Sequence, residues 1–170
     1  TLEVMKANGL RLLLVGYESG NQQILHNIKK GLLVDVAKRF SRDCRELGIV
    51  VHGTFILGLP GETPEDIDEL IAFSREFAAI LTMALGVPPL VPKLHTPLGD
   101  SPFAGIEAID QTLDKLRKGL EGTAEIRSTS ARWAWVEYRL SQGGAEAGRA
   151  AHEAWQAGGD FRAWERAFVG

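Results

Sequence analysis

The chain has 170 residues, of which 45% are hydrophobic and 24% charged, and its formal net charge is −3. These values are typical of one soluble globular domain and exclude a disordered or membrane protein. The acidity is mild and is spread without blocks of like charge. It therefore gives no electrostatic reason to expect nucleic acid or a membrane surface as a partner.

The sequence also limits which targeting signals and which cysteine chemistry this chain can have. No apolar run approaches the roughly 18 residues that cross a bilayer, and the first residues lack the order of a secretion signal, so we expect a cytosolic protein. Cys44 is the only cysteine, which rules out an internal disulfide and a cysteine-built metal site completed within this chain. Its helical spacing from Phe40 and Leu47 favours a buried structural thiol.

Residues 1–122 alternate strand and helix patterns. The apolar run 10–15 predicts a strand buried on both faces that ends at a polar turn, and the periodicity of 32–47 predicts a helix. A second strand is expected over 49–57. The next helix begins at Thr63 and Pro64, with a side-chain cap and a proline at the first helical position, and runs to about residue 77. A third strand between 81 and 91 and a helix over about 104–120 follow.

This alternation predicts an α/β fold with right-handed βαβ units on a parallel sheet, and with ligands at the carboxyl ends of the strands. From residue 123 the pattern changes to helices over 132–140, 146–156 and 161–168. We therefore expect two parts, a partial (β/α) barrel over 1–122 and a helical extension over 123–170. The aromatic side chains of the extension are more typical of helix packing than of an interface; they are Trp133, Trp135, Tyr138, Trp155 and Trp164.

Three segments carry a family resemblance. Residues 16–25, which read GYESGNQQIL and lead to the basic residues and glycine at 29–31, resemble the fourth-strand region of radical S-adenosylmethionine (SAM) enzymes. Residues 53–66, GTFILGLPGETPED, are similar to the fifth strand of that superfamily and the loop after it. Residues 87–98, VPPLVPKLHTPL, resemble the sixth strand of a subset often fused to an upstream cobalamin-binding domain.

The resemblance implies site residues at these strand ends. Glu18, with Gly16 and Ser19 beside it, would hold the ribose of SAM, because a carboxylate can accept hydrogen bonds from two neighbouring hydroxyls. Gly53, Ile56 and Gly58 would let backbone amides and an apolar side chain approach the adenine. Lys30 and His95 are candidates for substrate binding.

Simpler interpretations stand beside these. Glu18 could merely cap its turn, and the glycines could serve ordinary strand ends. Glu62 could hold its loop or only favour the helix N-terminus, and Lys30 could complement a helix dipole. A hydrogen-bonded structural role is an alternative for His95.

The family's cluster motif decides how much chemistry this chain can perform. Three cysteines hold the 4Fe-4S cluster of such enzymes, and this chain lacks them. A complete eight-stranded barrel takes about 250 residues. We therefore expect the natural gene to extend upstream, so that a missing N-terminal half supplies the cluster ligands and this part alone is inactive and aggregation-prone.

The leading hypothesis is a radical SAM enzyme that generates a 5'-deoxyadenosyl radical to act on a small-molecule substrate, with cobalamin use through an upstream domain left open. A relative of the tRNA methylthiotransferases is one alternative, although five arginines and five acidic residues balance over 131–170, which argues against RNA. A non-catalytic scaffold that has lost the cluster is the other alternative.

Overall fold

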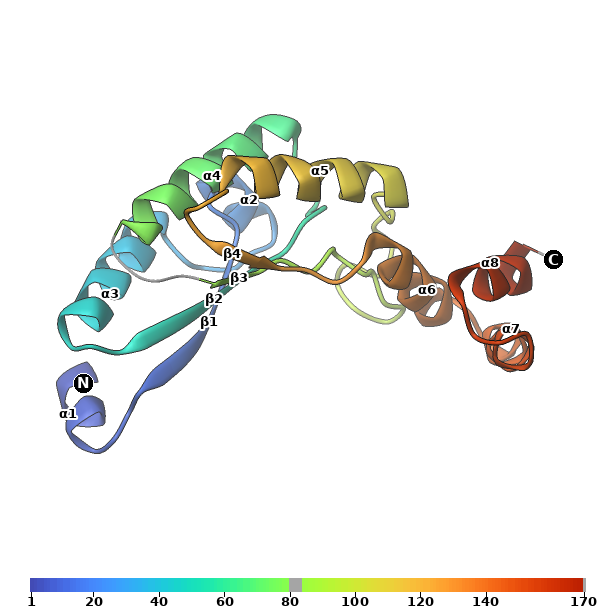
Figure 1. Cartoon of the computed structure of the whole chain (residues 1–170), viewed down its shortest axis with the longest axis horizontal. Coiled ribbons are helices and arrows are strands. Elements are labelled where there is room, and N and C mark those ends of the chain that lie inside the picture. The colour runs from blue at the N-terminus through green and yellow to red at the C-terminus, as the bar shows by residue number, and fades with distance from the viewer. Residues whose placement is uncertain (80–83, 170) are drawn as a thin grey trace. The chain divides into compact units, whose positions relative to one another are not determined.

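The computed structural model describes residues 1–79 and 84–169 (Figure 1). The chain forms two compact units. The first comprises Thr1–Pro88 and Gln111–Ser128, and the second comprises Pro89–Asp110 and Thr129–Gly170. The division into 1–122 and 123–170 drawn from the sequence stays a prediction.

A parallel sheet in the order β1-β2-β3-β4 forms the centre of the first unit. The strands are β1 (Leu12–Glu18), β2 (Val50–Phe55), β3 (Ala84–Gly86) and β4 (Glu125–Arg127). The helices of this unit are α1 (Leu2–Ala7), α2 (Gln22–Asn27), α3 (Val34–Glu46), α4 (Pro64–Ala78) and, from Gln111 onward, α5 (Ile106–Gly119). The predicted α/β class with parallel strands is confirmed.

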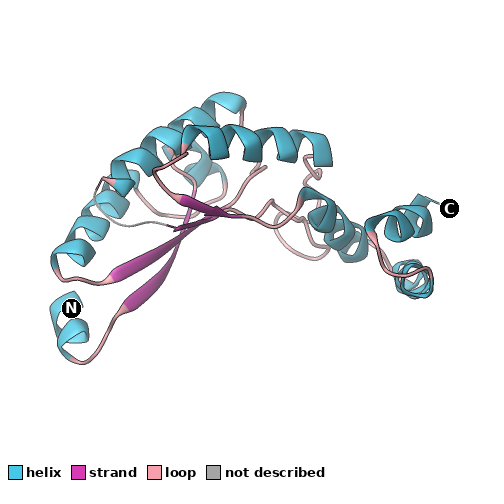
Figure 2. Cartoon of the chain, viewed as in Figure 1, coloured by secondary structure: helices cyan, strands magenta, loops and turns pink. Residues whose placement is uncertain are grey.

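One face of the sheet carries the core. Side chains alternate across a strand, and those of Tyr17, Phe55 and Leu85 are buried on the face that the helices cover (Figure 2). The Tyr17 ring lies 5.7 Å from the rings of both Phe55 and Phe77, and its hydroxyl is 2.6 Å from the Ser41 Oγ of α3. This aromatic cluster fixes α3 and α4 against β1 and β2.

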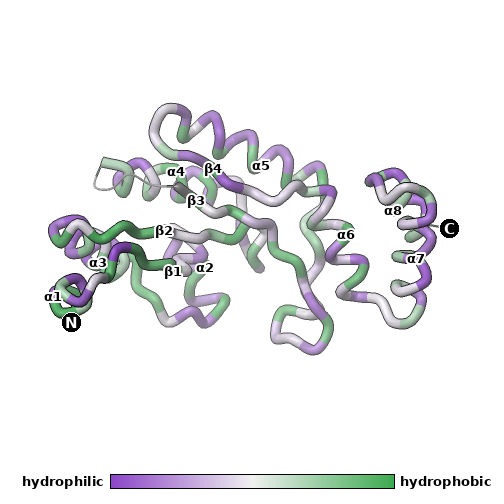
Figure 3. The backbone as a smooth tube through the Cα atoms, turned by 60° about the horizontal axis from the view of Figure 1, so that its bottom comes forward, coloured by the Kyte–Doolittle hydropathy of each residue, from purple (hydrophilic) through white to green (hydrophobic). Residues whose placement is uncertain are grey.

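The other face of the sheet, called the open face below, is uncovered within the described residues. Leu12, Leu14 and Val50 point to it, and their side chains are 48%, 73% and 53% exposed. The prediction that β1 is buried on both faces is therefore wrong, because helices lie on one side only. The tube of Figure 3 is largely apolar along β1 and β2 and hydrophilic at β4.

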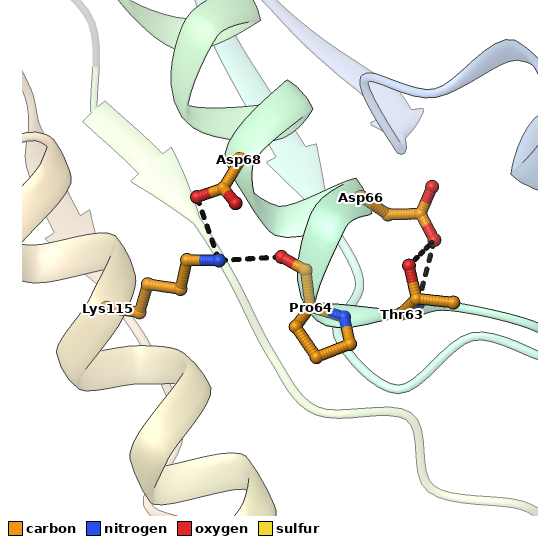
Figure 4. A network of polar contacts seen from close by, with 5 residues as sticks. All are labelled: Thr63, Pro64, Asp66, Asp68 and Lys115. Atoms are coloured by element: carbon orange, nitrogen blue, oxygen red, sulfur yellow. Dashed lines mark hydrogen bonds and ion pairs between the residues drawn. The ribbon is translucent and has the colours of Figure 1, made fainter.

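The start of α4 follows the sequence signals closely. Asp66 accepts hydrogen bonds from the Thr63 backbone N–H at 2.7 Å and from the Thr63 hydroxyl at 2.9 Å, so the first turn is closed by its own side chains. Lys115 of α5 donates to the Pro64 carbonyl at 2.7 Å and pairs with Asp68 at 2.8 Å (Figure 4). These contacts join α5 to the beginning of α4.

Several boundaries differ from the sequence-based expectation. β1 continues through Glu18 instead of ending before residue 16, because Tyr17 is a core residue. Within the described residues the third strand is Ala84–Gly86, and the part expected at 81–83 lies outside them. β4 was not expected; it has three residues and no apolar run.

The second unit contains α6 (Ala131–Gln142), α7 (Ala145–Gln156) and α8 (Phe161–Val169), as predicted to within a few residues. Trp135 packs edge-on against Phe161 and Phe168, with ring centroids 5.7 and 5.8 Å apart. Gln142 donates to the Pro92 and Gly99 carbonyls, both at 3.0 Å. Trp133 and Trp155 depart from the expected packing, since both are exposed. Among the described helices, none has the length and apolarity to cross a membrane.

Candidate functional site

The carboxyl end of β1 has an unusual backbone. The pairing with β2 is irregular between Gly16 and Glu18, and Glu18 has a φ of 66°, which few residues other than glycine adopt. The Ser19 N–H donates to the Tyr17 carbonyl at 2.9 Å across this residue, and the Ile56 N–H donates to the Glu18 carbonyl at 2.9 Å. Strained conformations of this kind persist where the surroundings hold them, and they cluster at functional sites.

The Glu18 side chain pairs with Lys30, which follows α2. The Lys30 Nζ lies 2.8 Å from Glu18 Oε1, and the two side chains are 34% and 18% exposed respectively. A Cβ atom added at Gly16 would lie 2.5 Å from that Oε1 and 3.2 Å from the Lys30 Nζ. Glycine at position 16 therefore leaves the space in which this ion pair lies.

Ser19 is buried and supports the turn. Its Oγ accepts a hydrogen bond from the Asn21 N–H at 3.1 Å. Asn21 caps α2 through the Ile24 N–H at 3.0 Å, and its amide donates to Asp66 at 2.8 Å and to Glu69 at 2.6 Å. The sequence analysis missed Asn21. Its preference for a helix N-cap could have been noticed, whereas its bonds to α4 depend on tertiary structure.

Gly53 in β2 and Gly58 in the loop after it are needed for different reasons. A Cβ atom at Gly53 would lie 2.9 Å from Cδ2 of Tyr17, on the helix-covered face, so core packing requires this glycine. Gly58 has a φ of 78°, and its N–H donates to Glu62 Oε2 at 2.6 Å. The roles of Gly53, Ile56 and Gly58 toward adenine remain predictions.

Glu62 holds the loop after β2 through that bond to Gly58. Burial raises the pKa of the Glu62 carboxyl to about 7, the Gly58 hydrogen bond opposes this rise, and the negative charge of Asp66 adds to it. Of the two roles considered for Glu62, the geometry supports the loop-holding one.

The structure brings most of the predicted site residues into one unit. Gly16, Glu18, Ser19 and Lys30 meet at the end of β1. The segment 53–58, which is the end of β2 and the loop after it, joins them through the bond between Ile56 and Glu18. His95 lies instead in the second unit, in an exposed turn with a φ of 63°.

Gly16 also begins a row of residues on the open face whose other members the sequence analysis missed. Pairing across the sheet places Gly16 opposite Thr54, Thr54 opposite Gly86, and Gly86 opposite Arg127. Arg127 lies in the three-residue strand β4, whose pairing with β3 could not be foreseen from an apolar run.

The residues present do not fit an iron-sulfur cluster. Cys44 is fully buried, and its burial raises the pKa of the thiol, which disfavours the thiolate that binds metal. Among the described residues, no group of three or more His, Cys, Asp or Glu side chains could hold a metal ion. Any cluster ligands must therefore lie outside the part of the chain described here.

Comparisons with known proteins give matches to part of this chain. Residues 1–74 match the model of the radical SAM superfamily. The ribosomal protein uS12 methylthiotransferase RimO of Chromobacterium violaceum is 38% identical over 66 residues, which cover 36% of this chain and 15% of that protein. An uncharacterized protein of Methanocaldococcus jannaschii is 29% identical over 102 residues, covering 55% and 22%.

The bacteriochlorophyllide d C-8(2)-methyltransferase of Chlorobaculum tepidum is 34% identical over 79 residues, covering 45% of this chain and 17% of that protein. The chain thus spans less than a quarter of the length of each of these three relatives.

Proposed function

Because residues 1–74 belong to the radical SAM superfamily, we propose that this chain is part of an enzyme that cleaves SAM to a 5'-deoxyadenosyl radical. A 4Fe-4S cluster supplies the reducing electron in such enzymes. In this proposal its ligands come from an N-terminal half of the same protein. The present chain supplies the wall that binds the SAM nucleoside and part of the pocket for a small-molecule substrate.

The position and conformation of Glu18 are the observation that carries the proposal. It stands at the carboxyl end of a parallel strand, where ligands of α/β sheets bind, and its backbone is held at a φ of 66°. One carboxylate oxygen accepts from Lys30, so the lysine fixes the orientation of the group. The carboxylate can then accept hydrogen bonds from the two ribose hydroxyls.

The simpler role of Glu18 as a turn cap has less support. Ser19 Oγ is the side-chain atom that accepts from the turn, through the Asn21 N–H. The Glu18 carboxylate extends instead to Lys30, over Gly16. If Glu18 served only the turn, its side chain would not need the space that glycine at position 16 leaves for it.

The loop after β2 supports the same proposal. Its backbone is joined to Glu18 by the Ile56 N–H, and the bond from Gly58 to Glu62 keeps the loop closed. These bonds use the N–H groups of Ile56 and Gly58, so the carbonyls of this loop and the Ile56 side chain are the groups that can contact the adenine beside the proposed ribose site. We propose these contacts for Ile56 and Gly58, while Gly53 supports them from the core side.

The test uses the full-length protein that contains this chain, produced and reconstituted without oxygen. SAM affinity is measured by equilibrium dialysis, and 5'-deoxyadenosine release by chromatography. Hydrogen bonds to a charged group are worth about 1.5–3 kcal/mol, so Glu18→Ala should weaken SAM binding roughly ten- to a hundredfold. Release of 5'-deoxyadenosine should fall in parallel at low SAM concentration.

Glu76→Ala is the matched control, because Glu76 also pairs with a lysine, Lys38, at 2.7 Å but lies on α4 away from the strand ends. It should bind SAM like the wild type. SAM affinity that is equal in the wild type and in Glu18→Ala would contradict the ribose role. A full-length protein with neither bound iron nor 5'-deoxyadenosine release would instead favour the scaffold hypothesis.

The names of two relatives suggest outcomes for the radical, namely methylthio transfer and methyl transfer. We keep the methylthiotransferase as the second candidate. The balanced charge of residues 131–170 does not favour RNA as its substrate. Mass spectrometry of the product distinguishes an added methyl group from an added methylthio group. A cytosolic location belongs to the proposal as well, whereas cobalamin use through an upstream domain stays open.

A further inference from the structure

The row on the open face ends in a charged pair. Glu125 and Arg127 of β4 are two residues apart and therefore point to the same face, which is the face of Gly86 and Thr54. The Arg127 Nε and Nη2 atoms donate to the two Glu125 carboxylate oxygens, both at 3.0 Å. Arg127 thus holds a carboxylate by two parallel hydrogen bonds.

Between this pair and the Glu18–Lys30 pair the row contains Gly86 and Thr54, and His52 of β2 lies beside Gly86. A Cβ atom at Gly86 would lie 3.3 Å from Thr54 Cγ2 and 3.5 Å from His52 Nε2, so Thr54 and His52 share the open face with it. Gly16 stands at the other end of the row, beneath Glu18 and Lys30. Two of the four positions in the row are therefore glycine, which keeps the sheet accessible between the two charged pairs.

Stability does not explain the pair on β4. The Arg127 and Glu125 side chains are 60% and 63% exposed, and such exposed ion pairs add little to stability. The backbone of Arg127 is nevertheless fixed, because its carbonyl accepts from the Val87 N–H at 2.8 Å. Arg127 is also nearer than Glu125 to the carboxyl end of the strand, on the side where ligands of parallel sheets bind.

We propose that Arg127 binds a carboxylate group of the substrate on the open face, and that Glu125 occupies this position until the substrate replaces it. A guanidinium group matches a carboxylate through two parallel N–H bonds, and Glu125 already displays that geometry. The inference rests on the proposed function, since it places the substrate on the same face and at the same strand ends as the proposed SAM site.

The test measures binding of a simple carboxylate to the full-length protein without SAM. Succinate is the probe, inorganic phosphate is the comparison, and isothermal titration calorimetry at low ionic strength gives the affinities. Arg127→Gln should weaken succinate binding at least tenfold. Glu125→Gln should tighten it several-fold, because it removes the competing carboxylate. A purely structural pair would not produce the second change.

Arg117→Gln is the matched control. Arg117 is 53% exposed and also pairs with a nearby acid, Asp114, at 3.1 Å, but it lies on α5. It should bind succinate like the wild type. The inference is overturned if the wild type does not bind succinate, if Arg117→Gln weakens binding as much as Arg127→Gln, or if the Arg127-dependent site prefers phosphate.

The outcome of this experiment is independent of the outcome of the test of the proposed function. Succinate binding is measured without SAM and depends on Arg127, whereas the nucleoside site is tested by SAM affinity and depends on Glu18. Normal SAM dependence on Glu18 with no effect of Arg127→Gln on succinate overturns only the carboxylate site. The opposite pair of results overturns only the nucleoside role.

Discussion

Among the single residues, Glu62 gives the clearest prediction of how stability depends on pH. Its pKa is raised from 4.5 to about 7 in the folded protein, mainly by burial. At pH values between 4.5 and about 7, the Glu62 carboxyl is deprotonated in the unfolded chain but still protonated in the folded chain. The folded chain therefore binds more protons, and the contribution of Glu62 to stability falls as the pH rises. The loss is nearly complete above pH 8 and amounts to about 3 kcal/mol in all, at 1.36 kcal/mol for each pKa unit.

Glu62→Gln imitates the protonated form and should remove this dependence. Relative to the wild type, its free energy of unfolding should rise by about 2–3 kcal/mol between pH 4.5 and pH 7.5. Urea titrations followed by circular dichroism measure the difference. Glu65→Gln, at an exposed position in the first turn of α4, is the control and should follow the wild type. A constant difference between wild type and Glu62→Gln across this range would contradict the buried state of the carboxyl.

The sequence could indicate which residues gather at the site, but not how each of them acts. The alternating strands and the two motifs placed Glu18 and Gly58 at strand ends, and the structure puts both of them there. The ion pair of Glu18 with Lys30 spans 12 positions, and the bond that gives Glu62 its role depends on a loop conformation. Such contacts follow from three-dimensional packing and leave no local pattern.

On the scale of helices and strands, the long periodic segments were predictable and the short ones were not. α3 and α4 have amphipathic faces and, for α4, a capping box, so local signals define them. β4 has the sequence Glu-Ile-Arg and exists because β3 pairs with it. The predicted end of β1 was too early because Gly16 interrupts the apolar sequence pattern. The strand itself continues through Gly16 and the buried Tyr17 to Glu18.

The contact of β2 with β1 gives a prediction about packing. A Cβ atom at Gly53 would lie 2.9 and 3.0 Å from two carbons of the Tyr17 ring, which is itself enclosed by Phe55 and Phe77. Gly53→Ala should therefore destabilise the protein by about 1–3 kcal/mol, the usual cost of overpacking a core. Urea unfolding measures this change.

Gly148→Ala is the comparison for that variant. Gly148 lies within α7, and a Cβ atom there would meet nothing within 4 Å. Alanine should stabilise the helix by about 0.5–1 kcal/mol at this position. If Gly53→Ala is as stable as the wild type, the ring of Tyr17 is not packed as the structure describes.

At the scale of the whole molecule, the open face governs how the chain behaves when it is produced alone. Counting strands from the sequence predicted an incomplete sheet, and the structure leaves Leu12, Leu14 and Val50 exposed on one face. β1 is also an edge strand in the described sheet, so its outer backbone groups can pair with another chain. An apolar face beside such an edge favours association between copies.

We therefore expect the isolated 170-residue chain to self-associate and to bind a hydrophobic dye such as ANS. Leu14→Lys places a charge at the most exposed of these positions and should reduce association, because edge lysines oppose strand pairing. Val4→Lys is the control, since Val4 is 65% exposed but lies on α1. Sedimentation velocity over a range of concentrations measures both variants. A wild-type chain that stays monomeric at about 100 μM, within the μM–mM range in which exposed apolar surface drives aggregation, would show that the open face is not a site of association.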